Sequence, residues 1–271
     1  TIDKDASIAS FKELIENGYV RYDDLPLRKR NGSIISVEFD SNSYNVGDDR
    51  VIQCNIRAIS DKKGAEKKSA EYNHSISISM HEMVDTLSSL IDQRDPYTAG
   101  HQSRVADLSV RIAAELNLPA HTIEGIHMSA MIHDIGKVSI PTEVLTKPTK
   151  LTECEWQMLK NHVQTGYDIL KNIHFPWPVA QIVLQHHERL DGSGYPNGLK
   201  GDSISLEARI IAIADCVEAM SGNRPYRMAL GLEAALQMLD NDHGILFDID
   251  ATQACLQLFR EKNYTFTKTA W

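Results

Sequence analysis

Apolar positions recur every three or four residues through most of the chain beyond residue 100, which is the spacing of one face of an α-helix. The pattern is plainest in three places: at Val105, Leu108 and Ile112, along the run 126–132, and at Leu159, Val163 and Ile169. Residues 231–259 predict two further helices joined by a glycine-containing turn. These stripes predict a mainly α protein whose helices pack as a bundle.

The first sixty residues have a different pattern, in which β-branched and aromatic residues are interleaved with polar ones. Residues 11–18 predict a short helix. Residues 25–60 predict three strands separated by turns at Asn31-Gly32 and Gly47-Asp48, because such pairs are favoured in hairpin turns. We therefore expect a small α+β segment before the helical bundle.

Residues 61–95 open with charge and continue with an apolar stripe at helical spacing, which predicts a linker helix. The stripe consists of Ile76, Met80, Met83, Leu87, Leu90 and Ile91. Two uses of the stripe remain open: packing against the helical domain of the same chain, or pairing with a second copy to form a homodimer. The chain is thereby divided into an N-terminal segment (1–63), a linker helix (64–95) and a helical domain (96–271).

Composition narrows the classes of partner. The 271 residues carry a formal net charge of −9, which argues against binding of polynucleotides, since that normally needs a basic face. The four cysteines are scattered without a CxxC spacing, which favours a reducing, cytoplasmic compartment. No apolar run has membrane-spanning length and the first residues do not resemble a signal peptide, so we expect no membrane segment in this chain.

The adjacent pair His133-Asp134 is the first candidate for chemistry. It follows the apolar run 126–132, where an unpaired ionisable pair would be costly and a cation would offset the cost. Further imidazole and carboxylate groups lie in other helical segments: His101, His162, His186, His187 and Asp215. Because each can point inward from its own helix, the set predicts a metal site with two cations in the core of the bundle.

The motifs HDIGK (133–137) and HHERLDGSGYP (186–196) carry a family resemblance. Residues 80–265 resemble the HD-GYP subgroup of the HD-domain phosphohydrolases, and the DGSGYP element is the specific part of the match. Residues 8–63 are similar to the second half of a PAS sensor domain. Because the first half, which usually helps to enclose a ligand, is missing, we expect no bound sensory ligand.

The resemblance implies how two metals are held. One is expected at His101, His133, Asp134 and Asp215, and the other at Asp134, His162, His186 and His187. A third metal described for some members uses a glutamate where this chain has Tyr97, so two metals are expected. Mixed imidazole and carboxylate ligands suit Fe(II) or Mn(II), although Zn or Ni can occupy such a site in purified protein.

The resemblance also implies the reaction, which is hydrolysis of a cyclic dinucleotide, a bacterial second messenger. The substrate is cyclic di-GMP, cut to linear pGpG and in some members on to GMP, or 3′,3′-cyclic GMP-AMP. Two cations lower the pKa of a bridging water, whose hydroxide attacks phosphorus. Asp134 and Lys137 are the expected catalytic residues, and the expected substrate contacts are Lys137, Gly194, Tyr195, Arg224 and Arg227.

Two alternatives remain open at this point. One is a catalytically silent signalling adaptor that docks diguanylate cyclase domains through the DGSGYP segment (191–196), hereafter the GYP loop. The other is an HD-type phosphohydrolase acting on different nucleotides. The intact set of ligand residues disfavours the first, and the DGSGYP and NRPYR (223–227) segments disfavour the second.

Overall fold

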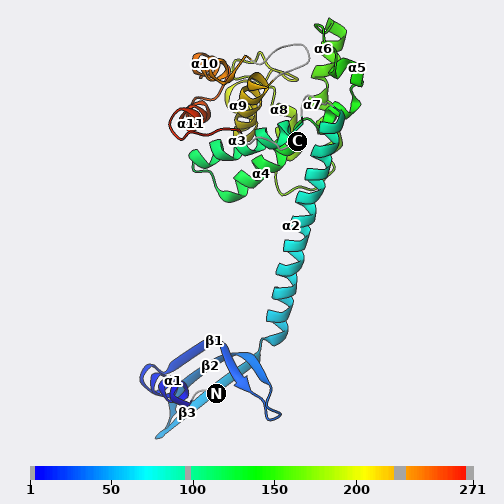
Figure 1. Ribbon diagram of the computed structural model, residues 1–271. Coiled ribbons are helices and arrows are strands. Elements are labelled where there is room, and N and C mark those ends of the chain that lie inside the picture. The colour runs from blue at the N-terminus through cyan, green and yellow to red at the C-terminus, as the bar shows by residue number, and fades with distance from the viewer. Residues whose placement is uncertain (1–3, 95–98, 223–229, 267–271) are drawn as a thin grey trace. The chain divides into compact units, whose positions relative to one another are not determined.

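The described residues, 4–94, 99–222 and 230–266, form two units in this computed structural model, which divide after Ser79 (Figure 1). Helix α2 (Ser60–Arg94) begins in the first unit and ends in the second. The mainly α class with a small α+β segment is confirmed. The division into 1–63, 64–95 and 96–271 stays a prediction.

The N-terminal unit is one helix and an antiparallel sheet of strand order β1-β2-β3. Its elements are α1 (Lys4–Asn17), β1 (Tyr19–Arg28), β2 (Ile34–Val46) and β3 (Asp49–Ala58). Both predicted hairpin turns form, at Gly32 and Gly47, whose positive φ angles of 87° and 64° favour glycine. Strand β1 begins six residues earlier than predicted, since a register shift between Tyr22 and Leu25 accommodates the polar pair 23–24.

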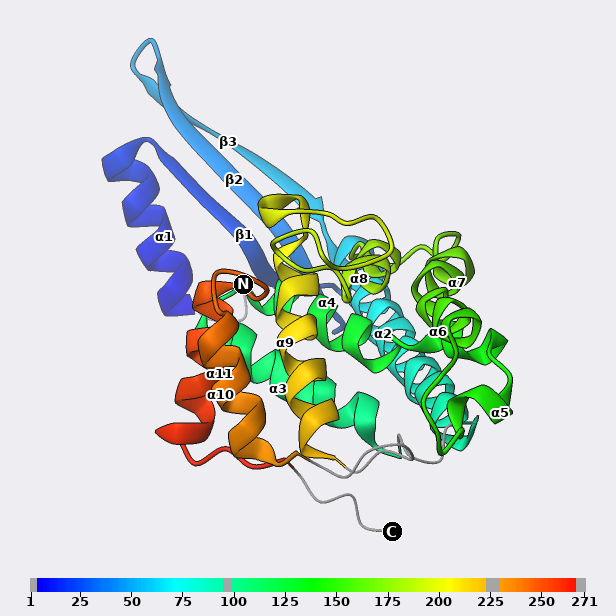
Figure 2. The same cartoon turned by 90° about the horizontal axis from the view of Figure 1, so that it is seen from above.

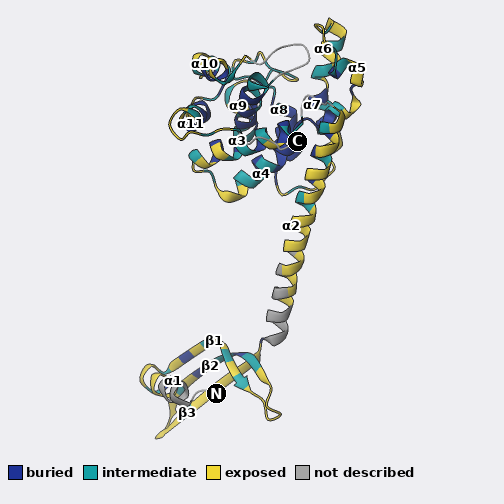
Figure 3. Ribbon diagram, in the orientation of Figure 1, coloured by how far each residue is buried: buried dark blue, intermediate teal, exposed yellow. Residues whose placement is uncertain are grey.

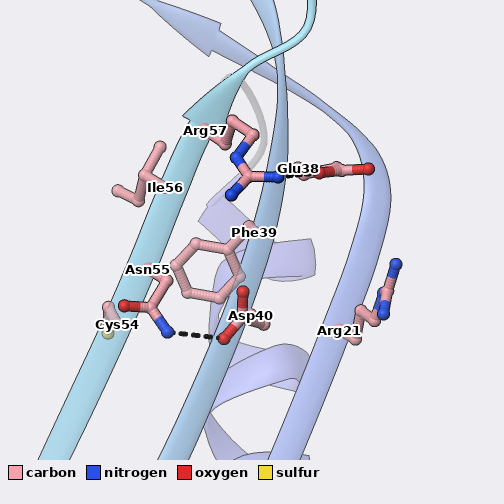
Figure 4. Close-up of a pocket in the computed structure, with 8 residues that line it drawn as sticks. All are labelled: Arg21, Glu38, Phe39, Asp40, Cys54, Asn55, Ile56 and Arg57. Atoms are coloured by element: carbon pink, nitrogen blue, oxygen red, sulfur yellow. Dashed lines mark hydrogen bonds and ion pairs between the residues drawn. The ribbon is translucent and has the colours of Figure 1, made fainter.

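One face of this sheet carries an open groove of about 530 Å³ (Figure 4). Its charged side chains are paired with acidic neighbours: Arg57 lies 4.0 Å from Glu38, and Arg21 donates to Asp23 at 2.8 Å. Asn55 donates to Asp40 at 2.7 Å. The groove is therefore a polar sheet surface with balanced charge. The likeness of this unit to a PAS domain is not confirmed.

The second unit is a helical bundle whose buried residues gather on α3, α4, α8 and α9 (Figure 3). In chain order its elements after α2 are α3 (His101–Glu115), α4 (Ala120–Met131), η1 (Ile135–Ser139), α5 (Thr142–Leu145), α6 (Glu153–Lys160), α7 (His162–Leu170), α8 (Val179–Gln185), η2 (Gly201–Ser203), α9 (Leu206–Ser221), α10 (Leu232–Asp242) and α11 (Ile249–Arg260). Helices α10 and α11 lie beside α9 and α3, and α6 and α7 lie on the opposite side of α9 (Figure 2).

The apolar stripes occupy this core except in the third, where Leu159 is only half-buried and Ile169 is exposed. Val105, Leu108 and Ile112 are fully buried, whereas Ile169 is 41% exposed and Leu170 is buried in its place. The chain bends at Asn161, between α6 and α7, so residues before and after it do not share one helical face. No described helix combines the length and apolar character needed to cross a membrane.

Helix α2 uses its predicted stripe in two ways. Ile91 is buried in the core of the helical unit together with Val84, which the predicted stripe did not include, and Met80 and Leu87 pack against that core. Other apolar residues of the helix remain exposed: Ile76, Met83 and Leu90. Packing against the same chain therefore occurs, and it leaves a second apolar face without cover among the described residues.

Candidate metal centre

All seven predicted ligand residues lie at one place in the bundle, mostly at helix ends. His101 and His162 are the first residues of α3 and α7, and His186 and His187 follow α8. His133 and Asp134 join α4 to η1, and Asp215 lies within α9. Their ligand atoms form three groups, each within 4.8 Å: His101, His133 and Asp215; His133, Asp134 and His186; His162, His186 and His187.

A glycine allows two of these segments to approach each other. A Cβ atom on Gly136 would lie 1.8 Å from the carbonyl oxygen of His162 and 2.6 Å from the nitrogen of Gly166. Only a residue without Cβ permits η1 to pack directly on the first turn of α7. This contact brings Asp134 Oδ1 to 3.4 Å from His162 Nε2.

The hydrogen bonds of three buried histidines fix which nitrogen faces the centre. The Nδ1 atoms of His133, His162 and His186 donate to the carbonyl oxygens three residues earlier, at 2.7, 2.7 and 2.6 Å. Each Nε2 atom therefore carries a lone pair, and in the described part of the chain none of the three has a hydrogen-bond partner. Buried, unpartnered acceptors that converge on carboxylates fit divalent cations.

Asp134 lies between the two halves of the cluster. Its Oδ2 is 3.4 Å from His133 Nε2 and 3.8 Å from His101 Nε2, while its Oδ1 faces His162. Asp215 completes the first half, with Oδ1 at 3.3 Å from His101 Nε2. Each oxygen of Asp134 thus faces a different set of imidazoles, which is the arrangement needed to bridge two cations.

The protonation states favour metal binding. Burial lowers the pKa of His186 to about 3 and also lowers the pKa values of His162 and His187, so these imidazoles stay neutral. Burial alone would raise the pKa of Asp134, but the nearby positive charge of Lys137 is the largest of the effects that hold it well below its usual range. The site therefore offers neutral nitrogens and an ionised carboxylate at neutral pH, as metal ligands require.

Glu218 contacts His101 on the side of the imidazole ring that faces away from the cluster. This carboxylate is 5% exposed, accepts a hydrogen bond from His101 Nδ1, and accepts another from Arg104 Nε at 2.7 Å. The contact leaves His101 Nε2 facing Asp215 and Asp134. A carboxylate behind a ligating histidine fixes the orientation of the ring and raises its basicity.

Glu218→Gln is expected to weaken metal affinity by roughly 10-fold or more, because removal of such a partner typically costs 10–100-fold. Competition with a chelator measures the affinity, and activity should return at saturating metal. Glu207→Gln, a change in the first turn of the same helix away from the cluster, should leave affinity unaltered. Equal affinities of parent and Glu218→Gln would contradict this role.

The GYP loop is held against the cluster by Glu188. This buried carboxylate accepts hydrogen bonds from the backbone N–H groups of Asn197 and Leu199, at 2.8 and 3.0 Å. A Cβ on Gly194 would lie 2.4 Å from the Glu188 Cα, so only glycine fits there. The Tyr195 ring lies 4.8 Å from that of His187, and burial raises the pKa of its hydroxyl.

Of the remaining predicted substrate contacts, one lies at the cluster and two fall outside the described residues. Lys137 Nζ donates to Asp134 Oδ2 at 2.7 Å. Arg224 and Arg227, and also Tyr97, lie outside the described residues. The roles of all these residues, and of the seven candidate ligands, stay predictions.

Two residues that support the centre were not assigned a role from the sequence. Glu188 directly follows the histidine doublet, so its place in the motif was the available signal. Glu218 stands at a position where an aspartate is common in the family that the chain resembles, but its contact with His101, 117 residues earlier, is made only by the fold.

Comparison with known proteins gives the context of this cluster. Residues 85–251, more than half of the chain, match a family model described as the HD domain. The chain is 42% identical over 178 residues to the cyclic di-GMP phosphodiesterase response regulator RpfG of Xanthomonas campestris pv. campestris, covering 65% of this chain and 47% of that protein.

Two further relatives match a similar share of this chain. A cyclic di-GMP phosphodiesterase of Thermotoga maritima is 37% identical over 198 residues, 72% of this chain and 54% of the relative. The 3′3′-cGAMP-specific phosphodiesterase 3 of Vibrio cholerae is 38% identical over 160 residues, 59% of this chain and 35% of the relative. The chain thus spans about half, or less, of the length of these relatives.

Among solved structures, Bd1817, an HDG"Y"P protein from Bdellovibrio bacteriovorus, aligns with a TM-score of 0.51 at 14% identity. The alignment covers 89% of this chain and 99% of that one. At this identity the likeness supports the fold alone.

Proposed function

Because the chain belongs to the HD-domain family, we propose that it is a metal-dependent phosphodiesterase that hydrolyses a cyclic dinucleotide. The substrate is cyclic di-GMP or 3′,3′-cyclic GMP-AMP, the two compounds named for its relatives. The observation that carries the proposal is the convergence of buried, unpartnered Nε2 atoms on the shared carboxylate of Asp134. The product is a linear dinucleotide, pGpG from cyclic di-GMP, with a second cut to GMP as a further step.

The proposed cofactors are two divalent cations, Fe or Mn, with Zn or Ni as replacements in purified protein. His101, His133 and Asp215 would hold one, the three histidines 162, 186 and 187 the other, and Asp134 both. When bound, such a pair lowers the pKa of a water molecule and neutralises charge on the phosphate that is cut. Neutral imidazoles and ionised carboxylates are the donor set that this chemistry requires.

The residues of the chain have separate roles in this proposal. Asp134 stays ionised in a buried site and holds the two halves of the cluster together. Lys137 places an ammonium group at the edge of the same carboxylate, where it can bind a phosphate oxygen as negative charge develops. Tyr195, beside His187, and Gly194 form the wall on which the dinucleotide would lie.

Lys137→Ala is expected to keep both metals and to lower kcat roughly 100-fold, as removal of one donor to a developing anion does. Metal content by elemental analysis and steady-state kinetics measure the two effects. The matched control is Lys147→Ala, which also removes an ion-paired lysine, at 2.6 Å from Glu155, and should leave kcat unaltered. Loss of metal in Lys137→Ala, or a parental kcat, would contradict the assigned role.

The decisive experiment is product analysis by chromatography after incubation of Mn- or Fe-loaded protein with each dinucleotide, with EDTA-treated protein as control. Metal-dependent formation of a linear dinucleotide supports the proposal, and the relative rates identify the preferred substrate. Protein that holds two metals and cuts neither compound would favour the adaptor that docks diguanylate cyclase domains, or another nucleotide substrate.

Two finer points belong to the proposal. A homodimer through α2 is supported by Ile76, Met83 and Leu90, which are 53%, 66% and 53% exposed and spaced seven residues apart. A cytoplasmic location is supported by the absence of disulfide bonds among the described residues, which include all four cysteines, Cys54, Cys154, Cys216 and Cys255.

A further inference from the structure

A lysine beside the GYP loop has two aromatic neighbours from different parts of the chain. Lys160 is the last residue of α6, two positions before His162. Its Nζ atom lies 5.9 Å from the centre of the Tyr195 ring and 6.0 Å from the centre of the Trp156 ring. Trp156 precedes Lys160 by one helical turn, but Tyr195 belongs to the loop that borders the cluster, so the ammonium group lies where α6 meets the site.

Lys160 differs from other lysines near the site in the partners of its ammonium group. Lys137 is bound to Asp134, and Lys147 is bound to Glu155. No carboxylate pairs with Lys160 among the residues 4–94, 99–222 and 230–266 that the structure describes. Lys160 is half-buried, and its ammonium group, near two rings, gains only modest stabilisation from them, so it can still bind an anion.

Trp156 adds a flat apolar surface at the same edge. Trp156 is 42% exposed, although a large indole is usually mostly buried in a protein. The neighbouring Met158 is 47% exposed. An exposed indole beside a cation is the combination that binds a nucleobase by stacking and its phosphate by charge.

The substrate of the proposed function needs such a second contact. A cyclic dinucleotide carries two phosphodiester groups and two bases, and only one phosphate can lie at the cluster during a given cut. The Tyr195 ring connects the two places, with His187 at 4.8 Å on the cluster side and Lys160 at 5.9 Å on the α6 side.

We propose that Lys160 and Trp156 form a second substrate-contact site, in which Lys160 binds the phosphate that is not being cut and Trp156 stacks against one base. This inference rests on the proposed function. It predicts a selective loss: removal of Lys160 weakens binding of a substrate with two phosphates more than that of a substrate with one.

The test compares Lys160→Ala with the parent, both loaded with metal, on cyclic di-GMP and on bis(4-nitrophenyl) phosphate, a diester with a single phosphate. KM for cyclic di-GMP should rise roughly tenfold or more, the usual effect of losing a charge-assisted contact, with kcat little altered. The loss in kcat/KM should be several-fold smaller for the one-phosphate diester. Lys160→Arg, which keeps the charge, should restore most of the affinity.

Lys171→Ala is the matched control. Lys171 also lies over a tyrosine ring, with Nζ 5.8 Å from the centre of Tyr167, but Asp168 already neutralises it at 2.6 Å. Calorimetric titration of metal-loaded protein with a hydrolysis-resistant phosphorothioate analogue of cyclic di-GMP gives a second readout, in which Lys160→Ala and Trp156→Ala should both bind more weakly than Lys171→Ala.

The outcomes separate this inference from the proposed function. If the parent cuts both compounds and Lys160→Ala has the parental KM, the second contact site is refuted. Equal losses on both compounds would assign Lys160 to support of Tyr195 and the cluster, which also refutes it. If the loaded parent cuts neither cyclic di-GMP nor 3′,3′-cyclic GMP-AMP, the proposed function fails and the inference fails with it.

Discussion

Asp134→Asn is expected to remove bound metal and hydrolysis together while the fold persists. The carboxylate contributes one oxygen to each half of the cluster, at 3.4 Å from His133 Nε2 and 3.4 Å from His162 Nε2. An amide has nearly the same shape but lacks the charge, and its NH₂ group cannot serve as a ligand. Loss of a residue that hydrogen-bonds to a metal ligand already lowers metal affinity 10–100-fold, so loss of a ligand shared by both metals should lower it by more than about 100-fold.

The measurement is metal content after dialysis, together with turnover and a thermal melt. Asp240→Asn is the matched control, since it makes the same chemical change in a surface ion pair with Arg260 at 3.0 Å and should retain metal and activity. A variant Asp134→Asn that holds two metals with parental affinity would contradict the bridging role of Asp134.

Gly136→Ala is expected to destabilise the helical unit by about 3 kcal/mol, at the upper end of the usual cost of overpacking. The added Cβ would lie 1.8 Å from the carbonyl oxygen of His162 and 2.6 Å from the nitrogen of Gly166, and both are backbone atoms that cannot rotate away. The first turn of α7 must then shift, and His162 shifts with it. The melting temperature should therefore fall by roughly 6–12 °C, and metal affinity should fall as well.

Gly222→Ala provides the comparison, because its Cβ would meet Glu218 O at an ordinary 3.6 Å. Differential scanning calorimetry of the metal-free proteins isolates the packing cost from the loss of bound metal. If Gly136→Ala has the same melting temperature as Gly222→Ala and the parent, the close contact between η1 and α7 is not part of the folded protein.

The elements that could be predicted from the sequence are those with a local signal. The stripe at Val105, Leu108 and Ile112 marks the buried face of α3, and the pairs at Gly32 and Gly47 mark hairpin turns. The candidate ligands were found because motifs record chemistry directly, and the fold places all of them in one cluster.

What could not be predicted depends on partners far away in the sequence. Nothing near Asn161 signals that α6 ends and α7 begins there, and the exposure of Ile169 follows from that bend. The pairing of Glu218 with His101 spans 117 residues, and the approach of Lys160 to Tyr195 joins the end of α6 to a loop much further along the chain. Local periodicity carries no information on such contacts, because tertiary packing alone determines them.

The most direct test of the account is a titration of metal-stripped protein with Mn(II), in which bound metal and hydrolysis of cyclic di-GMP and cyclic GMP-AMP are measured in the same samples. The account predicts no hydrolysis without metal and full activity only as the second equivalent binds. Hydrolysis at the full rate by metal-free protein, or protein that holds two metals per chain and cuts neither dinucleotide, would contradict it.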